Sequence, residues 1–303
     1  MVTPVYTLFL EEELKWYITA TEDASSWMHK FAAIMQLEPS STNRFSKLIF
    51  TTLQVDQKLS SALARTLHDC SGDIFPPQDW WFEDLGLVKF WRNQHSEHII
   101  CQLSGQSIYE VDINKMSLSL HVIYQKAIEK EGLPLHAGLV EKEEMGVVLA
   151  APGSTGKSTC CRRIPFPWHA LCDDETLLVR DVQGSFYAHP FPTWSEYLCK
   201  RSERTWNVER RIPLSAIFFL AQSETEELAA ITQAESAAFL HQLSLQIYGR
   251  GLKRLKASEG KKQSRCLFDN ACQLAKSLPA YMLRVSREGR FWEKMEEALE
   301  RVC

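Results

Sequence analysis

The sequence feature that constrains this chain most is a phosphate-binding loop between an apolar run and the start of a helix. Residues 147–151 are apolar, residues 152–156 form a turn that contains two glycines, and Gly156, Lys157 and Ser158 end it. The apolar run predicts a buried strand, and the residues from Lys157 onward predict a helix. The backbone N–H groups of such a turn converge on a di- or triphosphate, and the helix N-terminus adds unpaired donors. The stretch therefore predicts a nucleotide-binding P-loop, with a chance match after a buried strand as the alternative.

The loop pattern also predicts which residues contact the nucleotide and Mg²⁺. The expected nucleotide contacts are Gly153, Ser154, Thr155, Gly156, Lys157, Ser158 and Thr159. In a P-loop the lysine reaches the β and γ phosphates and the following hydroxyl ligates Mg²⁺, so Lys157 and Ser158 take those roles and ATP and Mg²⁺ are the expected cofactors. The strict pattern has glycine five residues before Gly156, where this chain has Ala151. Gly153 still lets the turn take positive φ.

Two adjacent acids and one histidine are the further candidates for catalysis. Asp173 and Asp174 follow a short apolar strand expected at 168–172, only 16 residues after Lys157. Carboxylates at a strand end beside a P-loop are placed to hold Mg²⁺ and to accept a proton from an attacking hydroxyl. A solvated acidic turn is the alternative. His136 lies on a strand expected at 133–141, next to the P-loop strand, where a lone histidine is either catalytic or structural.

Composition excludes several other classes of function. The net charge of −4 argues against nucleic acid as a partner. The nine cysteines include no Cys-x-x-Cys pair, so neither a zinc site nor a disulfide framework is expected. No basic segment opens the chain and no apolar run has the length of a membrane span, so we expect a cytoplasmic protein that does not contact a membrane. The sequence leaves the oligomeric state open.

The order of the predicted elements indicates an α/β (α+β, mixed-sheet) protein in two parts. Residues 1–131 are expected to form an α+β accessory or recognition region, and residues 132–303 the P-loop catalytic domain. Within the first part, 88–92, 97–103 and 107–111 are predicted strands and 116–131 a helix. Within the second, residues 189–194 are predicted to form a proline-fixed loop. The basic stretch 250–265 is expected to be an exposed loop or a mobile segment that closes over nucleotide.

Several of these motifs together resemble the HPr kinase/phosphorylase family. They are the stretch at 135–137, the hairpin and P-loop that follow, and the acids after Cys172. The later stretches 189–195 and 213–220 are similar to HPr kinase-related proteins encoded beside ribosomal-peptide modification genes, with the kinases of the SynChlorMet cassette and of lasso-peptide precursors nearest. The motif-bearing resemblance covers about residues 133–220.

The resemblance implies a fold and a set of roles. The fold would be the core shared with phosphoenolpyruvate carboxykinases, in which a P-loop lies on a mostly antiparallel, curved sheet. Lys157 and Ser158 match the family's phosphate and Mg²⁺ residues, and His136 matches a histidine near the phosphates. One acid would serve the metal and the other the substrate hydroxyl, with Asp173 and Asp174 in those respective roles. The Glu-x-Arg-Gly-Leu-Gly type segment of the bacterial enzyme is absent, which argues against HPr as substrate and against phosphorolysis.

We therefore expect an ATP- and Mg²⁺-dependent kinase that phosphorylates a Ser or Thr hydroxyl on a ribosomally made precursor peptide or a small protein. Two other functions stay open. One is a kinase of a small metabolite, which a deep closed pocket would favour. The other is a non-catalytic module that recognises a partner through residues 1–131 and uses nucleotide as a switch.

Overall fold

The computed structural model describes residues 4–40, 47–153, 155–201, 203–255 and 257–301, and its chain separates into two compact units. Unit 1 comprises residues 1–123 and 194–209, and unit 2 comprises residues 124–193 and 210–303. The division expected from the sequence lay between residues 131 and 132. The present boundary falls inside helix α4 (His121–Glu129), and unit 1 also takes in a later segment of the chain.

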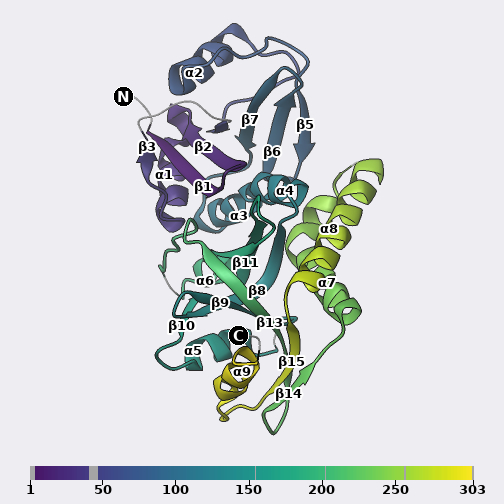
Figure 1. The fold of residues 1–303 in the computed structure, drawn as a ribbon. Coiled ribbons are helices and arrows are strands. Elements are labelled where there is room, and N and C mark those ends of the chain that lie inside the picture. Colours follow the sequence, from purple (N-terminus) through teal and green to yellow (C-terminus); the bar gives the residue numbers. More distant parts are fainter. Residues whose placement is uncertain (1–3, 41–46, 154, 202, 256, 302–303) are drawn as a thin grey trace. The chain divides into compact units, whose positions relative to one another are not determined.

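Unit 1 is built on a seven-stranded mixed sheet in the order β3-β1-β2-β4-β7-β6-β5 (Figure 1). The β2–β4 and β4–β7 pairs are parallel and the other pairs are antiparallel. Its strands are β1 (Val5–Glu11), β2 (Leu14–Ala20), β3 (Pro39–Ser40), β4 (Lys47–Thr51), β5 (Trp81–Asp84), β6 (Val88–Asn93) and β7 (Ser96–Leu103). Its helices are η1 (Glu22–Ala24), α1 (Ser25–Ile34), α2 (Ser61–Ser71), α3 (Tyr109–Ser119) and α6 (Trp194–Leu198).

The later segment joins unit 1 through aromatic packing and main-chain hydrogen bonds. The Trp194 ring stacks on Phe31 of α1 at a centroid distance of 6.5 Å. The backbone N–H of Trp206 donates to the carbonyl oxygen of Ile34 at 2.8 Å, and Glu209 Oε1 accepts from the N–H of Phe9 at 2.6 Å. The buried side chains of this segment, Trp194, Tyr197, Trp206 and Val208, thus join the hydrophobic core of unit 1, although they are far from it in sequence.

Two expectations for unit 1 were wrong. Residues 107–111 were predicted as a strand, but α3 begins at Tyr109. The short alternation there is outweighed by Ile113, Met116 and Leu120, which are all buried and recur at helical spacing. The helix expected at 116–131 is two helices, because α3 ends at Ser119 and α4 starts at His121. At the join, the N–H of Leu120 donates to the carbonyl of Ser117, which tightens the last turn.

Unit 2 contains an eight-stranded sheet whose pairings close on themselves. The path runs β10-β8-β11-β12-β13-β15-β14, and β9 pairs with both β8 and β13. Of these pairs, β13–β9 and β13–β15 are parallel and the others are antiparallel. The strands are β8 (Leu133–Lys142), β9 (Met145–Ala150), β10 (His169–Cys172), β11 (Glu175–Arg180), β12 (Phe186–Phe191), β13 (Ile212–Gln222), β14 (Glu227–Ala230) and β15 (Ala280–Val285). The loop predicted at 189–194 therefore begins as strand, since β12 continues to Phe191.

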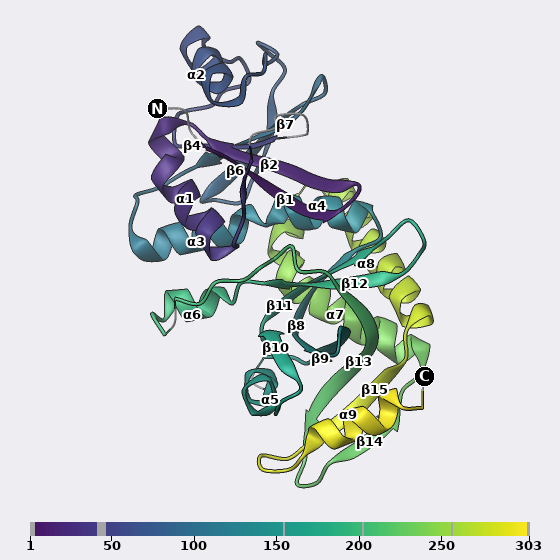
Figure 2. The ribbon, with the colours of Figure 1, turned by 60° about the vertical axis from the view of Figure 1, so that its left-hand side comes forward.

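Helices cover both faces of the central strands of unit 2 (Figures 1 and 2). Along β9 the alternate residues Val147 and Leu149 pack in a core with helix α5 (Lys157–Arg163) and helix α9 (Phe291–Leu299). On the other face, Phe219 of β13 packs against Phe239 of helix α7 (Gln233–Leu252) at 5.1 Å between ring centroids. The alternation of side chains along buried strands thus fixes which helix each residue meets.

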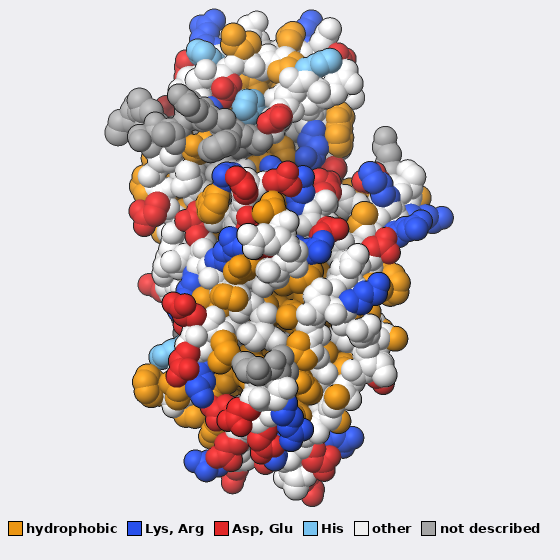
Figure 3. All heavy atoms as spheres, in the orientation of Figure 1, with side chains coloured by type: hydrophobic (Ala, Val, Ile, Leu, Met, Phe, Trp, Pro, Cys, Tyr) orange, Lys and Arg blue, Asp and Glu red, His pale blue; other side chains and the backbone are white. Residues whose placement is uncertain are grey.

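The basic stretch at 250–265 is mostly helical, so the expected loop was wrong except for a short turn at 253–255. Helix α7 continues to Leu252 and helix α8 (Ala257–Ser277) carries residues 257–265. Lys and Arg side chains gather over the end of α7 and over α8 at the right of Figure 3. A charged face with buried residues such as Leu267 and Leu274 on the opposite side is typical of a helix that packs on a core. Among the described residues, no helix is long and apolar enough to cross a membrane.

Candidate functional site

The turn predicted to be a P-loop, called the P-loop below, joins β9 to α5 in unit 2, so the predicted order of strand, turn and helix is confirmed. β9 ends at Ala150 and α5 begins at Lys157. Gly156 precedes the helix with φ of 108°, a left-handed conformation that strains any residue with a Cβ atom. Among the described residues, no atom lies within 4 Å of a Cβ built on Gly153 or Gly156, so the outer side of the turn is open. Ser154, an expected nucleotide contact, lies outside the described residues.

The position of α5 depends on a close approach of β8. A Cβ atom added to Gly138 would lie 2.7 Å from Cys161 Sγ, 3.4 Å from the Cys172 carbonyl oxygen and 3.5 Å from Asp173 Cα. Cys161 points from α5 into this contact and is buried. Glycine at 138 therefore lets the first helix after the P-loop and the acidic turn pack against the same strand.

Lys157 is buried at the base of the loop with a relative exposure of 6%. Its Nζ donates to the Ala151 carbonyl oxygen at 2.8 Å and lies 2.8 Å from His136 Nε2. Burial lowers the pKa of Lys157, and the negative charges of Asp174 and Asp173 act in the opposite sense. The lysine is thus held by β8 and by its own loop. One of the two polar partners of Lys157 Nζ is the carbonyl oxygen of Ala151, the residue that stands where the strict pattern has glycine.

His136 connects Lys157 to Asp174. Its Nδ1 lies 3.2 Å from Asp174 Oδ1, on the opposite side of the ring from Lys157. Burial, and then the nearby Lys157, lower the pKa of His136, which favours the neutral ring. Because a lysine can only donate, Nε2 accepts and the single ring proton is assigned to Nδ1, facing the carboxylate. Burial raises the pKa of Asp174. The three predicted residues therefore form one line of close polar contacts.

Asp173 and Asp174 lie in the turn between β10 and β11 and have different partners. Asp173 Oδ1 accepts a 2.7 Å hydrogen bond from Thr193 Oγ1, whereas Asp174 faces His136. The two carboxylates are therefore held in separate orientations, one toward the segment after β12 and one toward the P-loop lysine. Thr193 was not a candidate from the sequence.

A third acid, which sequence reasoning did not single out, adjoins this line. Glu175 is opposite His136 in the antiparallel register of β11 and β8, and residues directly opposite share one face of a sheet. Its Oε2 accepts a 2.7 Å hydrogen bond from Tyr124 Oη. Burial raises the pKa of Glu175 to about 8, and that of Tyr124 well above its ordinary value. The sequence shows that Glu175 directly follows Asp174, which could have marked it as a candidate. Its position opposite His136 depends on strand register and could not be predicted from the sequence.

The oxygen donors near the loop fit Mg²⁺ in part. Ser158, half-buried in the first turn of α5, and Asp173 supply a hydroxyl and a carboxylate, the hard oxygen ligands that Mg²⁺ prefers. Among the described residues, no group of three or more His, Cys, Asp or Glu side chains could hold a metal ion by itself. This donor set suits an ion that takes its remaining ligands from phosphates and water. The other expected contacts, Thr155 and Thr159, are half-buried and exposed respectively.

A small apolar cavity adjoins the first half of the P-loop. Its volume is about 100 Å³, and its walls come from the end of β9, from the parallel strands β13 and β15 and from α7. The lining residues are Ala150, Ala151, Pro152, Phe219, Leu220, Phe239, Gln242, Leu243 and Met282.

Comparison with known protein families identifies the family of this chain. A family model described as SynChlorMet cassette protein ScmC matches residues 99–300, about two thirds of the chain. A comparison with curated proteins gave no match. The chain belongs to the ScmC family.

Proposed function

We propose that this member of the ScmC family is a kinase that transfers the γ-phosphoryl group of ATP to a Ser or Thr hydroxyl of a ribosomally made precursor peptide or small protein. The observation that carries the proposal is the line Lys157–His136–Asp174 at the end of the P-loop. It brings a phosphate-binding cation and a carboxylate with a raised pKa to the same end of one loop. Phosphoryl transfer to a hydroxyl requires both.

The chemistry follows from these positions. The acceptor oxygen attacks the γ-phosphorus, the bond from that phosphorus to the bridging oxygen of ADP breaks, and the hydroxyl proton passes to Asp174. Lys157 stabilises negative charge on the phosphates, and His136 holds both Lys157 and Asp174 in place. Ser158 and Asp173 would hold Mg²⁺, which supplies charge neutralisation when bound with ATP. A base whose pKa is raised toward neutrality accepts the proton more effectively than an ordinary aspartate.

We further propose that unit 2 has the core of HPr kinases and phosphoenolpyruvate carboxykinases. Three features support this. The sheet is mostly antiparallel, the P-loop leaves a central strand, and a histidine of the neighbouring strand contacts the loop lysine. The acceptor is proposed to be a peptide rather than a metabolite because the described cavity beside the loop, at about 100 Å³, is small for a closed metabolite site.

The proposal is tested by ADP release with and without a precursor peptide encoded beside the gene. We expect peptide-stimulated ADP release in the native chain and in Lys294→Met, a half-buried lysine of α9 that pairs with Glu297. We expect a loss of at least about 100-fold in Lys157→Met, the order found when one charge-stabilising donor is removed. Equal release in all three would refute the assignment. Nucleotide binding without any transfer would favour the nucleotide-switched recognition module.

A further inference from the structure

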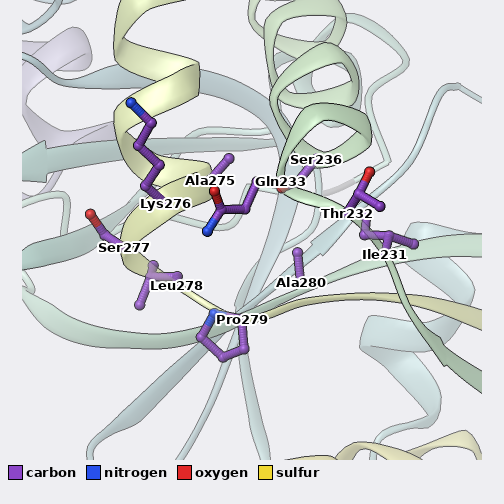
Figure 4. Close-up of a pocket in the computed structure, with 10 residues that line it drawn as sticks. All are labelled: Ile231, Thr232, Gln233, Ser236, Ala275, Lys276, Ser277, Leu278, Pro279 and Ala280. Carbon is purple, nitrogen blue, oxygen red and sulfur yellow. The ribbon is translucent and has the colours of Figure 1, made fainter.

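A polar pocket of about 290 Å³ lies in unit 2 where α7 begins and α8 ends (Figure 4). Its walls include Thr232, Gln233 and Ser236 on one side, and Lys276 and Ser277 on the other. Figure 4 shows the Gln233 side chain in the middle of the pocket, reaching from α7 toward the end of α8. Neither the P-loop nor the line through His136 contributes to this pocket.

The first turn of α7 has unpaired backbone donors, and Gln233 of this turn lines the pocket. The helix is 20 residues long, and Thr232 caps it by accepting from the N–H of Glu235. The N–H groups of Gln233 and Ala234, at the first two helical positions, have no carbonyl partner within the helix. The helix dipole adds partial positive charge at this end. The Glu235 carboxylate does not compete, because its Oε2 accepts from the N–H and hydroxyl of Thr232 at 2.8 and 2.7 Å.

Ser236 is the independent sign of a ligand. Its side chain is 0% exposed and lines the pocket, and among the described residues its Oγ has no hydrogen-bond partner. Buried hydroxyls are almost always hydrogen-bonded, so a partner for this one is expected from outside the protein. The exposed Lys276 lies at the rim; its ammonium points away from the other lining residues in Figure 4, and its flexible stem lets the positive charge turn toward a bound anion. Donors from a helix end, a hydroxyl, an amide and one ammonium match a singly charged oxyanion.

We propose that this pocket binds a carboxylate group and, resting on the kinase function proposed above, that the carboxylate belongs to the acceptor peptide. Helix α7 lines both this pocket and the cavity beside the P-loop. Ser236 faces the pocket, while Phe239 and Leu243, three and seven residues later on the same helix face, line the cavity. Strand β15 also lines both spaces, with Ala280 at the pocket and Met282 at the cavity. The two spaces therefore follow one another along one helix and one strand.

The spacing sets the kind of peptide. Seven helical residues from Ser236 to Leu243 rise roughly 10 Å, which about three residues of extended peptide span. A carboxylate about three residues away from the acceptor Ser or Thr would therefore reach the pocket while the acceptor hydroxyl lies at the P-loop. Either an Asp or Glu side chain or the terminal carboxylate of the peptide supplies this chemistry.

Backbone amide NMR of the full chain tests the pocket. The probes are N-acetyl-glutamate amide for a side-chain carboxylate, N-acetyl-alanine for a terminal one, and uncharged N-acetyl-glutamine amide. We expect at least one acid to shift the amides of Gln233 and Ala234 saturably, and the stronger binder identifies the source. The affinity should fall about three- to fivefold in Lys276→Gln and up to about tenfold in Ser236→Ala. Lys262→Gln, an exposed lysine of α8, should leave it unchanged.

Two results would overturn the pocket assignment: equal shifts with the uncharged probe, or unchanged affinity for the acids in both pocket variants. The kinase proposal is tested separately, by peptide-stimulated ADP release from the native chain. With the precursor peptide as substrate, Lys276→Gln should raise KM about three- to fivefold and leave kcat unchanged, because the pocket lies away from the reacting atoms. An unchanged KM would show that the carboxylate is not the acceptor's.

Discussion

Lys157 Nζ lies 2.8 Å from His136 Nε2, so the P-loop lysine of this chain is positioned by the neighbouring strand as well as by its own loop. A neutral imidazole is a suitable partner. It holds the buried ammonium without cancelling its charge, and it releases the lysine to phosphate at little electrostatic cost. Its other nitrogen faces Asp174, 3.2 Å away. Any change in the His136 ring should therefore act on Lys157, the proposed phosphate ligand, and on Asp174, the proposed base, together.

The two acids of the β10–β11 turn should separate by their effects on the metal and on turnover. Asp173 accepts from Thr193 and Asp174 faces His136. We expect Asp173→Asn to raise the Mg²⁺ concentration needed for half-maximal activity. Asp174→Asn should lower kcat by about 10²- to 10⁴-fold, the range for removing a general base, at an unchanged Mg²⁺ requirement. Titration of initial rates with Mg²⁺ distinguishes the two, and the reverse pattern would exchange the roles.

We expect kcat/KM to rise with pH as the Asp174 carboxyl loses its proton. Burial raises the pKa of this carboxyl above its ordinary value of 3.8, and the nearby Asp173 charge raises it further. Proton acceptance requires the ionised form, so kcat/KM should fall as pH drops through the raised pKa. Asp173→Asn removes a like charge and should move the limb to lower pH. A pH profile of kcat/KM for both chains tests this, and a limb that stays in place in the variant would exclude Asp174 as the titrating base.

Glu175 should make the fold less stable at alkaline pH. Burial raises its pKa from 4.5 to about 8, so its contribution to stability is fully present below pH 4.5 and is lost as pH rises through 8. Relative to Glu175→Gln, the native chain should lose up to roughly 5 kcal/mol of unfolding free energy between these pH values, since one pKa unit corresponds to about 1.4 kcal/mol. Urea unfolding at pH 6 and pH 9 covers about two of these pKa units, so it should show roughly 3 kcal/mol of the loss.

Tyr124→Phe provides the control for this pH dependence. The Tyr124 hydroxyl donates to Glu175 and thereby lowers the pKa of the carboxyl. Without it the pKa should rise further, and the loss of stability should extend to higher pH. Parallel pH dependence in the native chain and in Glu175→Gln would show that Glu175 is not the group responsible.

Gly138 and Cys161 should be energetically coupled. A Cβ atom at 138 would lie 2.7 Å from Cys161 Sγ, so we expect Gly138→Ala to cost about 1–3 kcal/mol of unfolding free energy, the usual range for overpacking. Cys161→Ala removes that sulfur, and the double variant should be more stable than the sum of the single changes predicts. Chemical denaturation of the four chains measures the coupling. Additive effects would mean that the strand and helix do not approach as closely as described.

How much was predictable from the sequence depends on the range of the interactions. The strand, turn and helix of the P-loop are contiguous in sequence, so their residue pattern predicts them directly. Gly156 before Lys157 is one example, because the left-handed turn there needs glycine. His136, Asp173 and Asp174 were predicted from short spacings together with a family resemblance.

What could not be predicted depends on long-range register. Glu175 faces His136 only through the pairing of β8 with β11, and Tyr124 reaches Glu175 from a helix 51 positions earlier. The stacking of Trp194 on Phe31, which draws residues 194–209 into unit 1, is equally nonlocal. The strand predicted at 107–111 was wrong for a local reason. A brief alternation of apolar residues resembles a strand until the helical spacing of Ile113 and Met116 is considered.

The most direct test of the account is mass spectrometry of the precursor peptide after incubation with the chain, ATP and Mg²⁺. The account predicts a gain of one phosphate on a Ser or Thr of the peptide, lost in Lys157→Met and in Asp174→Asn and retained in Lys294→Met. A peptide that stays unmodified while the chain binds ATP, or a phosphate gained equally with all the variants, would contradict it.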